Sequence, residues 1–292
     1  MNADVRAAIA QHSQSFSLAS KLLGDASRDD VIVLYAWCRR ADDAVDLAPD
    51  AERAERVLRL YDELAAVYAG DTLDVPVLSA FQALVRRRGI PMEYPLALLD
   101  GMRSDSGTVR MATTDELLVY CHRVAGVVGL MLCDVFGLSD ARARDNAAHL
   151  GIAMQLTNIC RDVREDSERG RRYLPEDVLV ACGGDATGPE LVRRAVERLL
   201  ALAERYYRSA DAGFHALPLR AALAARAARR VYAAIGDELA ARGFDAMAGR
   251  VTVPLWKKVA LVAGAIVQEL ASRAGRRLFG RSPPAEILSR SR

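Results

Sequence analysis

The apolar residues of this chain come in runs broken by charged residues, and no stretch alternates between apolar and polar positions as a half-buried strand does. Two segments, Ser27-x-x-Asp30 and Thr113-x-x-Glu116, have the pattern of capping boxes that open helices. The predicted helix ends are marked by Gly137, Gly170, Gly183 and Gly184. No repeat of solenoid period is present. The pattern therefore predicts an all-α protein in which long helices surround a central cavity.

Two of the predicted helices each carry a pair of aspartates four residues apart. Asp42 and Asp46 follow the apolar run 31–38. Asp162 and Asp166 follow the apolar run 150–154. Residues four apart lie on one face of a helix, so each pair presents two carboxylates to one point. Like charges at this spacing destabilise a helix by about 0.2–0.5 kcal/mol, and burial adds to that cost. Stability alone gives no reason for the repeated pattern, whereas a bound cation would.

The side chains around these pairs indicate a magnesium diphosphate site. Mg²⁺ prefers oxygen ligands and is usually held by one or two carboxylates together with phosphate oxygens of a substrate. Gln155 and Asn158 precede the second pair at spacings that place all four oxygen-bearing side chains along one stripe of a helix. Arg39 and Arg161 lie beside the two pairs and can make charge-assisted hydrogen bonds to phosphate. A single such pair is more often a solvated charged face, but two pairs in apolar surroundings predict a pocket for Mg²⁺.

Composition narrows the class of protein. The 292 residues are 51% hydrophobic and 27% charged, so we interpret residues 1–292 as a single domain with a basic C-terminal tail from about residue 273. The net charge of +2 is too small to indicate a nucleic-acid partner. The five cysteines form no C-x-x-C pair and are typical of reduced core residues in a cytoplasmic protein. The first residues lack the pattern of a signal peptide, and the best apolar run, 259–267, is far below the roughly 20 residues of a membrane span.

Taken together, the motifs resemble those of the squalene/phytoene synthase family of head-to-head prenyl transferases, and in particular its bacterial phytoene synthase branch. The resemblance covers nearly the whole chain. The matching segments are 12–16, 35–43, 120–129, 155–166 and 170–175, together with Tyr232 and Arg250.

The resemblance implies both a fold and a reaction. The implied fold is an isoprenoid synthase-type helical bundle around a central cavity. The implied reaction joins two geranylgeranyl diphosphates head to head through a cyclopropyl diphosphate and releases diphosphate to give phytoene. The implied cofactor is Mg²⁺, with Mn²⁺ as a substitute, and NADPH is not expected because phytoene synthases finish by losing a proton. An apolar tunnel would hold the tails and exclude the water that would quench a carbocation.

The resemblance also assigns roles to individual residues. The metal ligands that it implies are Asp42, Asp46, Asn158, Asp162 and Asp166. The residues that it implies for diphosphate binding are His12, Arg39, Asn158, Arg161, Tyr232 and Arg250. The implied catalytic set consists of the four aspartates with Tyr173 and Gln155 near the reacting centre.

Three alternatives are open on the sequence alone. A squalene, dehydrosqualene or presqualene diphosphate synthase that uses farnesyl diphosphate would share every motif, because tail selection depends on the side chains at the tunnel floor. A terpene cyclase would use the same metal chemistry, but it usually carries an Asn/Ser/Glu-type triad, which the segment from Asp162 to Asp166 is not. A catalytically dead scaffold relative would have eroded aspartates, whereas both pairs are intact here.

The C-terminal segment predicts contact with a membrane. Between residues 273 and 292 six arginines are opposed only by Glu286. Basic residues that flank an apolar helical face attract anionic lipid by about 1 kcal/mol each near the surface. We therefore expect a cytoplasmic protein bound peripherally to the inner face of the membrane, with an ordinary solvated tail as the alternative. The expected partners are prenyl diphosphate substrates and a downstream desaturase.

Overall fold

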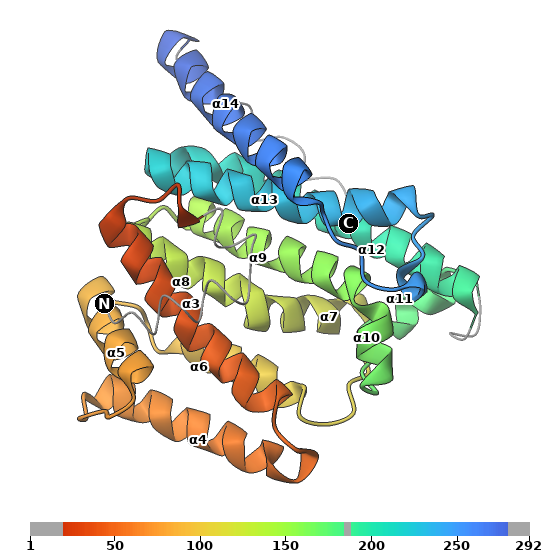
Figure 1. Ribbon diagram of the computed structural model, residues 1–292, viewed down its shortest axis with the longest axis horizontal. Helices are drawn as coiled ribbons and strands as arrows, with labels where there is room; N and C mark the ends of the chain where they lie inside the picture. The colour runs from red at the N-terminus through yellow and green to blue at the C-terminus, as the bar shows by residue number, and fades with distance from the viewer. Residues whose placement is uncertain (1–19, 184–187, 280–292) are drawn as a thin grey trace.

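The structure is a computed structural model that describes residues 20–183 and 188–279 (Figure 1). Its helices are α3 (Asp25–Asp46), α4 (Asp50–Ala69), α5 (Pro76–Arg88), α6 (Glu93–Ser104), α7 (Thr114–Cys121), the π-helix η1 (His122–Gly126), α8 (Val127–Phe136), α9 (Ala141–Arg161), α10 (Val163–Glu168), α11 (Glu176–Ala181), α12 (Pro189–Gly213), the 3₁₀-helix η2 (Phe214–Ala216), α13 (Leu219–Ala241), the 3₁₀-helix η3 (Ala246–Ala248) and α14 (Leu255–Phe279). The described residues contain no strand, only an isolated bridge between Arg110 and Arg172. The all-α prediction is confirmed.

The predicted signals at Thr113 and Gly137 set helix boundaries as expected. The Thr113 side chain accepts a hydrogen bond from the Glu116 N–H at 3.2 Å, and Glu116 accepts one from the Ala112 N–H at 2.7 Å. The first bond satisfies a donor that the first turn of α7 leaves without a helical partner, and the second holds the residue before the cap. Gly137 ends α8 in the left-handed conformation, with φ of 67°.

The capping box predicted at Ser27 is wrong. Helix α3 begins two residues earlier, at Asp25, and no side chain caps it. Asp30, the other member of the expected box, is buried and pairs with Arg88 of α5 at 2.6 Å. A buried carboxylate needs a partner, and the tertiary ion pair supplies one.

Two hydrophobic cores support the two predicted acidic segments. The first core packs α3, α4, α5 and α6 against α8, and the Trp37 and Phe81 rings stack in it with centroids 4.4 Å apart. The second core packs α9 against α7, α12 and α13 around residues such as Leu156 and Leu199. In Figure 1 the C-terminal end of α3 and the short helix α10 lie on the same side of the molecule. The cores therefore bring the ends of the two acidic segments to one region.

Helix α9 crosses η1 and α8 at near backbone contact. A Cβ on Gly151 would lie 2.2 Å from the Ala125 carbonyl oxygen, and a Cβ on Gly129 would lie 2.3 Å from that of Ala147. Only glycine allows so close an approach. The π-helical turn η1 lies at this crossing. The crossing therefore fixes how close α9 lies to η1 and α8. Helix α9 carries the first part of the second acidic segment.

One helical stretch, Thr114–Phe136, is long and apolar enough to cross a membrane by length and composition alone. It comprises α7, η1 and α8, and it packs against α6 and α9. Residues along it, including Leu117, Cys121 and Met131, are fully buried in the two cores. We therefore interpret this stretch as a central core helix of the bundle.

Helix α14 extends beyond the rest of the bundle and rests on α13 (Figure 1). Its anchor is Glu269, which is fully buried and accepts hydrogen bonds from Arg226 and Arg273 at 2.9 and 2.7 Å. Arg226 also lies over the Phe214 ring, 4.9 Å from its centroid. A buried carboxylate held by two guanidiniums is stable only while both remain, so this contact fixes where α14 leaves the body.

Candidate active site

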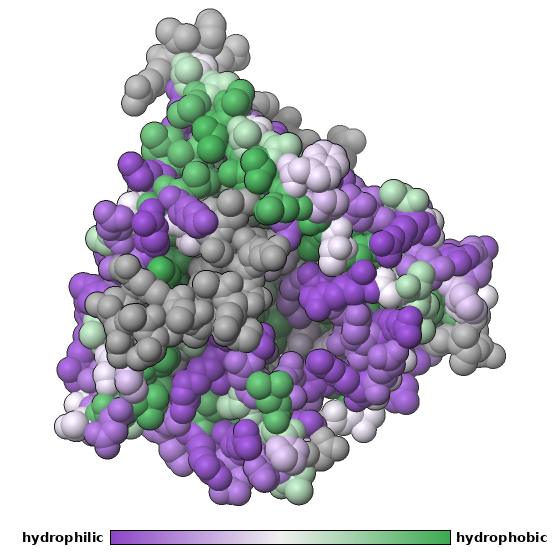
Figure 2. Space-filling model, viewed as in Figure 1, coloured by the Kyte–Doolittle hydropathy of each residue, from purple (hydrophilic) through white to green (hydrophobic). Residues whose placement is uncertain are grey.

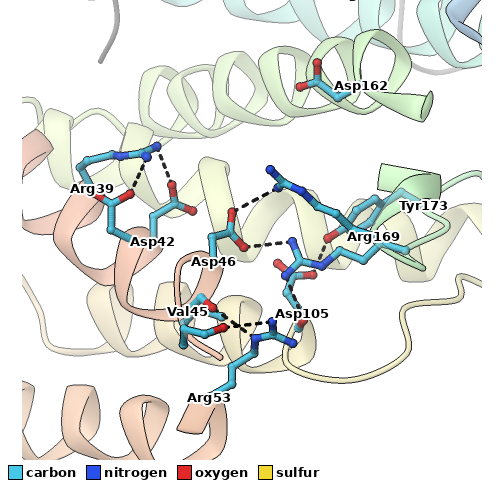
Figure 3. Close-up of polar contacts among 12 residues, drawn as sticks. Arg39, Asp42, Val45, Asp46, Arg53, Asp105, Asp162, Arg169 and Tyr173 are labelled. Atoms are coloured by element: carbon cyan, nitrogen blue, oxygen red, sulfur yellow. Dashed lines mark hydrogen bonds and ion pairs between the residues drawn. The ribbon is translucent and has the colours of Figure 1, made fainter. Parts of the chain in front are cut away.

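The first acidic pair lies at the end of α3. Val31, Val33, Leu34 and Trp37 of that helix are buried in the first core. Asp42 and Asp46 lie on the side that faces Asp162 (Figure 3). Arg39, one turn earlier, pairs with Asp42 at 3.0 Å and also with Asp43. The structure therefore places both aspartates and Arg39 on the same continuous helix.

The sequence predicted that the second acidic pair lies on one continuous helix, and this prediction is wrong. Helix α9 ends at Arg161 and α10 begins at Val163, with Asp162 between them at φ of −102° and ψ of 15°. Hydrogen bonds of the helical type continue across this break, because the Asp162 N–H donates to Asn158 O at 2.9 Å and the Asp166 N–H donates to Asp162 O at 2.8 Å. The break turns the chain while the two carboxylates stay close enough to interact.

Asn158 and Gln155 precede the break on α9, as expected from the spacing. The Asn158 amide nitrogen donates to Gln155 Oε1 at 3.5 Å. The Asn158 Oδ1 atom is buried and has no hydrogen-bond partner. A buried carbonyl oxygen without a donor costs about 1–3 kcal/mol, which a cation at this position would offset.

Arginines from several elements neutralise the aspartates. Arg171 Nη1 lies 3.0 Å from Asp46 Oδ1, and Arg169 Nη1 lies 3.9 Å from Asp46 Oδ2. Both arginines follow α10, so these pairs join the two acidic segments, and Figure 3 shows the contacts. Asp162 accepts from Arg161 Nε at 2.7 Å, and Arg250 Nε lies 3.2 Å from the same carboxylate.

Tyr232 of α13 belongs to the same region as Asp162. Burial raises the pKa of the Tyr232 hydroxyl, the positive charges of Arg161 and Arg250 lower it, and the negative charge of Asp162 raises it. The structure thus brings Arg161, Tyr232 and Arg250 together around Asp162, although they are far apart in the sequence.

A buried carboxylate, Asp105, lies behind the acidic pairs. The Tyr173 hydroxyl donates to Asp105 Oδ1 at 2.6 Å, and the Tyr120 hydroxyl donates to Asp105 Oδ2 at 2.8 Å. The two rings stack with centroids 5.0 Å apart. Arg171 Nη2 donates to the Asp105 carbonyl oxygen at 3.3 Å, so one arginine touches both Asp105 and Asp46. Tyr173 is therefore held rigidly beside the acidic pairs.

Three carboxyl groups of the site resist ionisation. Burial, and then the charge of Asp46, raise the pKa of Asp42 to about 6, although 43% of its side chain is exposed and Arg39 opposes the shift. Burial, and then the charge of Asp162, raise the pKa of Asp166 to about 7. Burial raises the pKa of Asp105 to about 6 against the effect of the two tyrosine hydrogen bonds. Asp105 raises the pKa of both Asp42 and Asp166, which shows that the two pairs share one electrostatic region.

The donor set fits a magnesium diphosphate better than a free-standing metal cage. Within residues 20–183 and 188–279, no three His, Cys, Asp or Glu side chains converge to hold a metal ion by themselves. Mg²⁺ is usually bound by one or two carboxylates and completed by substrate phosphate and water. Two crowded carboxylate pairs and the unpartnered Asn158 oxygen supply ligands of this type.

Most of the site residues expected from the sequence lie in this region. Those that the structure brings to it are Asp42, Asp46, Asp162, Asp166, Arg39, Arg161, Asn158, Gln155, Tyr173, Tyr232 and Arg250. His12 lies outside the described residues.

Sequence reasoning missed Asp105, Tyr120 and Arg171. Tyr120 and Arg171 lie in segments that match the family, but nothing in their spacing indicated a role. Asp105 lies in a segment without any pattern, so no sequence signal could have indicated it.

Known proteins resemble this chain over most of its length. The family model described as squalene/phytoene synthase matches residues 9–257. A 15-cis-phytoene synthase of Paracoccus sp. is 41% identical over 87% of this chain and 87% of its own length. A phytoene synthase of Pseudescherichia vulneris is 37% identical over 92% of each chain. The crystal structure of a dehydrosqualene synthase in complex with a ligand superposes with a TM-score of 0.85, at 29% identity, over 92% of this chain and 96% of that one.

Proposed function

This chain belongs to the squalene/phytoene synthase family, and on that premise we propose that it condenses two geranylgeranyl diphosphates head to head to phytoene and releases diphosphate. The reaction passes through a cyclopropyl diphosphate. The observation that carries the proposal is the convergence of two aspartate pairs and their arginines at one end of the bundle. Similarity of 37–41% to bacterial phytoene synthases over most of the chain supports this product over those made from farnesyl diphosphate.

The aspartate pairs and Asn158 form the proposed magnesium site, which Mn²⁺ could also occupy. The residues that would hold the metal ions are Asp42, Asp46, Asn158, Asp162 and Asp166. Bound Mg²⁺ supplies positive charge that stabilises the departing diphosphate. The raised pKa values of Asp42 and Asp166 support this role, because a divalent cation relieves the repulsion within each pair.

The arginines form the proposed diphosphate site. Arg39, Arg161 and Arg250 are paired with carboxylates of the two acidic pairs. When metal ions neutralise those carboxylates, the guanidiniums become available to donate charge-assisted hydrogen bonds to diphosphate oxygens. Tyr232, partly buried near Arg161, would donate its hydroxyl to the same oxygens.

We propose that Tyr173 and Gln155 act near the centre where the carbon chains react. Asp105 and Tyr120 fix the Tyr173 hydroxyl in one position. A fixed dipole at the carbocation stabilises charge without reorganisation, and a closed apolar surround excludes the water that would quench it. We assign Asp105 as a positioning residue for Tyr173.

A product assay tests the proposal. Purified protein is incubated with geranylgeranyl diphosphate and Mg²⁺ without NADPH, and the extracted hydrocarbon is identified by mass spectrometry. We expect phytoene and no turnover in excess EDTA. A product formed only from farnesyl diphosphate, or one that needs NADPH, would contradict the assignment of substrate and product, and full turnover in EDTA would contradict the metal site.

We further propose peripheral contact with a membrane through α14 and the basic segment that follows it. Figure 2 shows apolar residues gathered over α14. Trp256, Val259, Val267 and Leu270 are 73, 51, 68 and 49% exposed along this helix. Lys257 pairs with Glu238 of α13, and Arg273 pairs with Glu269 of α14 itself, so both cations have a counter-charge. An exposed apolar stripe flanked by basic residues suits the interface of an anionic bilayer.

Vesicle flotation tests this contact. We expect the intact protein to float with anionic vesicles, and both a truncation after Ser272 and a Trp256→Gln, Val267→Gln double variant to float less. Equal binding by all three proteins, or binding by none, would contradict a role for this helix and tail. A bilayer-bound enzyme could pass its hydrocarbon product to a desaturase, the downstream partner that we propose.

A further inference from the structure

A pocket lies on the side of α10 where α11, α12 and η3 pack. It has a volume of about 390 Å³. Its walls are mostly apolar, with side chains from α9, α10, α11, α12 and η3. The principal wall residues are Ile159, Val163, Leu179, Val192 and Met247. The volume falls within the range of small-molecule sites, which are usually apolar clefts with a few placed polar groups.

Three arginines line the same pocket, against one acidic residue, Asp166. The exposed Arg110 side chain makes no hydrogen bond or ion pair with any described residue. Arg172 pairs with Glu176 through one nitrogen, while its Nε atom is buried without a partner. The bridge between residues 110 and 172, with the Arg172 N–H 3.0 Å from Val109 O, holds these two arginines side by side. Two guanidiniums with unused donors therefore adjoin an apolar wall.

We propose that this pocket binds an anionic amphiphile, with a phosphate or carboxylate at Arg110 and Arg172 and a short hydrocarbon chain along the apolar wall. A guanidinium donates strong, charge-assisted hydrogen bonds to both kinds of anion. The apolar walls disfavour a wholly hydrophilic anion. The inference does not depend on the reaction proposed above, because the ligand would bind without metal.

The pocket adjoins the acidic site through shared residues. Asp166, Arg171 and Tyr173 line it, and on the other side Arg171 contacts Asp46 and Tyr173 contacts Asp105, whose charge also acts on Asp166. An occupant would therefore contact Asp166, a member of the second acidic pair, and the two residues that join this pair to Asp46 and Asp105. This gives the bound amphiphile a route to affect turnover.

Calorimetric titration in excess EDTA tests the proposal. The probes are geranyl monophosphate and decanoate, with geraniol and inorganic phosphate as the tail and the anion alone. We expect both amphiphiles to bind more tightly than either fragment, and the tighter of the two identifies the head group. Arg110→Gln and Met247→Glu should each weaken binding by about tenfold, since they remove a charged donor or add a repelling charge. Arg205→Gln, at an exposed arginine outside the pocket, should leave it unchanged.

Arg250→Gln separates this pocket from the acidic site. If the Arg250→Gln variant no longer bound the probe while the Arg110→Gln and Met247→Glu variants bound it normally, the probe would occupy the acidic site. The proposal would then be wrong. Absence of binding by both amphiphiles to the wild-type protein would also overturn it. Circular dichroism checks that each variant is folded, and Arg110→Gln alters an exposed side chain with no partner, so its result stands if Met247→Glu fails to fold.

Discussion

The two aspartate pairs have the same spacing in the sequence but different backbones in the fold. Asp42 and Asp46 lie on one unbroken helix of 22 residues, and their arginine, Arg39, comes from the same helix. Asp162 and Asp166 flank a break between two helices, and one of their arginines, Arg250, comes from a distant loop. Spacing alone positions side chains only where the helix is continuous. Across a break, tertiary contacts have to do so.

Replacing one aspartate of each pair is the strongest test of whether the two pairs are equivalent. We expect Asp42→Ala and Asp162→Ala each to lower turnover by about a thousandfold or more, equal to about 4 kcal/mol of transition-state stabilisation, because either loss removes a metal ligand. Steady-state assays at saturating Mg²⁺ measure the effect.

The exposed acids Asp25 and Glu168 provide matched controls on the same two segments. Their alanine variants should retain normal turnover. A helical circular dichroism spectrum in all four proteins separates a loss of chemistry from a loss of fold. Near-normal turnover in either Asp42→Ala or Asp162→Ala would show that this pair does not bind the metal.

Removal of Asp105 tests whether the two pairs form one unit. Asp105→Ala leaves the buried hydroxyls of Tyr120 and Tyr173 without their acceptor, so we expect a loss of about 3 kcal/mol in the free energy of unfolding. Asp105→Asn keeps one carbonyl acceptor and should cost less. Urea denaturation measures both. Equal, small losses in the two variants would mean that the tyrosines are not held by this carboxylate.

The close approach of α9 to η1 and α8 at Gly151 and Gly129 provides a test of how the second pair is held in place. The first pair lies on α3, which takes no part in this contact. Gly151→Ala would bring a methyl group to 2.2 Å from a backbone oxygen, so we expect about 2 kcal/mol of destabilisation and weaker Mg²⁺ binding. Gly275→Ala in α14 meets no atom within 4 Å and should be neutral or slightly stabilising. Thermal unfolding compares them. A neutral Gly151→Ala would show that the crossing can relax.

The smallest expected difference between the two pairs is in how the free energy of unfolding depends on pH. We expect an effect of about 1 kcal/mol after solvent screening. The folded-state pKa values of Asp42 and Asp166 are raised above the ordinary value of 3.8, to about 6 and about 7. The folded state therefore binds protons more tightly than the unfolded state, and ionisation destabilises it. Metal-free protein should lose stability as the pH rises from about 4 to about 7.

Single substitutions assign parts of that loss. Asp42→Asn should reduce the loss below about pH 6, where Asp105 supplies a further part, and Asp166→Asn should remove the part that extends to about pH 7. Urea midpoints measured across this range in EDTA provide the test. Midpoints that rise with pH in the wild-type protein would contradict the pKa shifts.

The features that the sequence predicted correctly are those that depend on neighbouring residues in the chain. The helix face of Asp42 and Asp46, the cap at Thr113 and the helix end at Gly137 all depend on residues within one or two turns. The cap at Ser27 was mispredicted because Asp30 has a stronger partner far along the chain, Arg88 of α5.

The rest of the site depends on long-range contacts that spacing does not encode. The break at Asp162 leaves the hydrogen-bond ladder nearly intact, so no proline or glycine marks it. Asp105 gains its importance only from Tyr120, Tyr173 and Arg171, which come from other elements. The family resemblance identified most of the residues in contact but none of the geometry that joins them.

The arginine–aspartate pairs of the site have a consequence for the order and strength of ligand binding. A metal ion that binds Asp42 or Asp162 releases a guanidinium, and a diphosphate that binds a guanidinium releases a carboxylate. Each ligand therefore raises the affinity for the other, and the two increases are equal by thermodynamic reciprocity. We expect strong heterotropic cooperativity between Mg²⁺ and diphosphate. Free diphosphate, the by-product of catalysis, should consequently inhibit the enzyme weakly when magnesium is scarce and strongly when it is abundant.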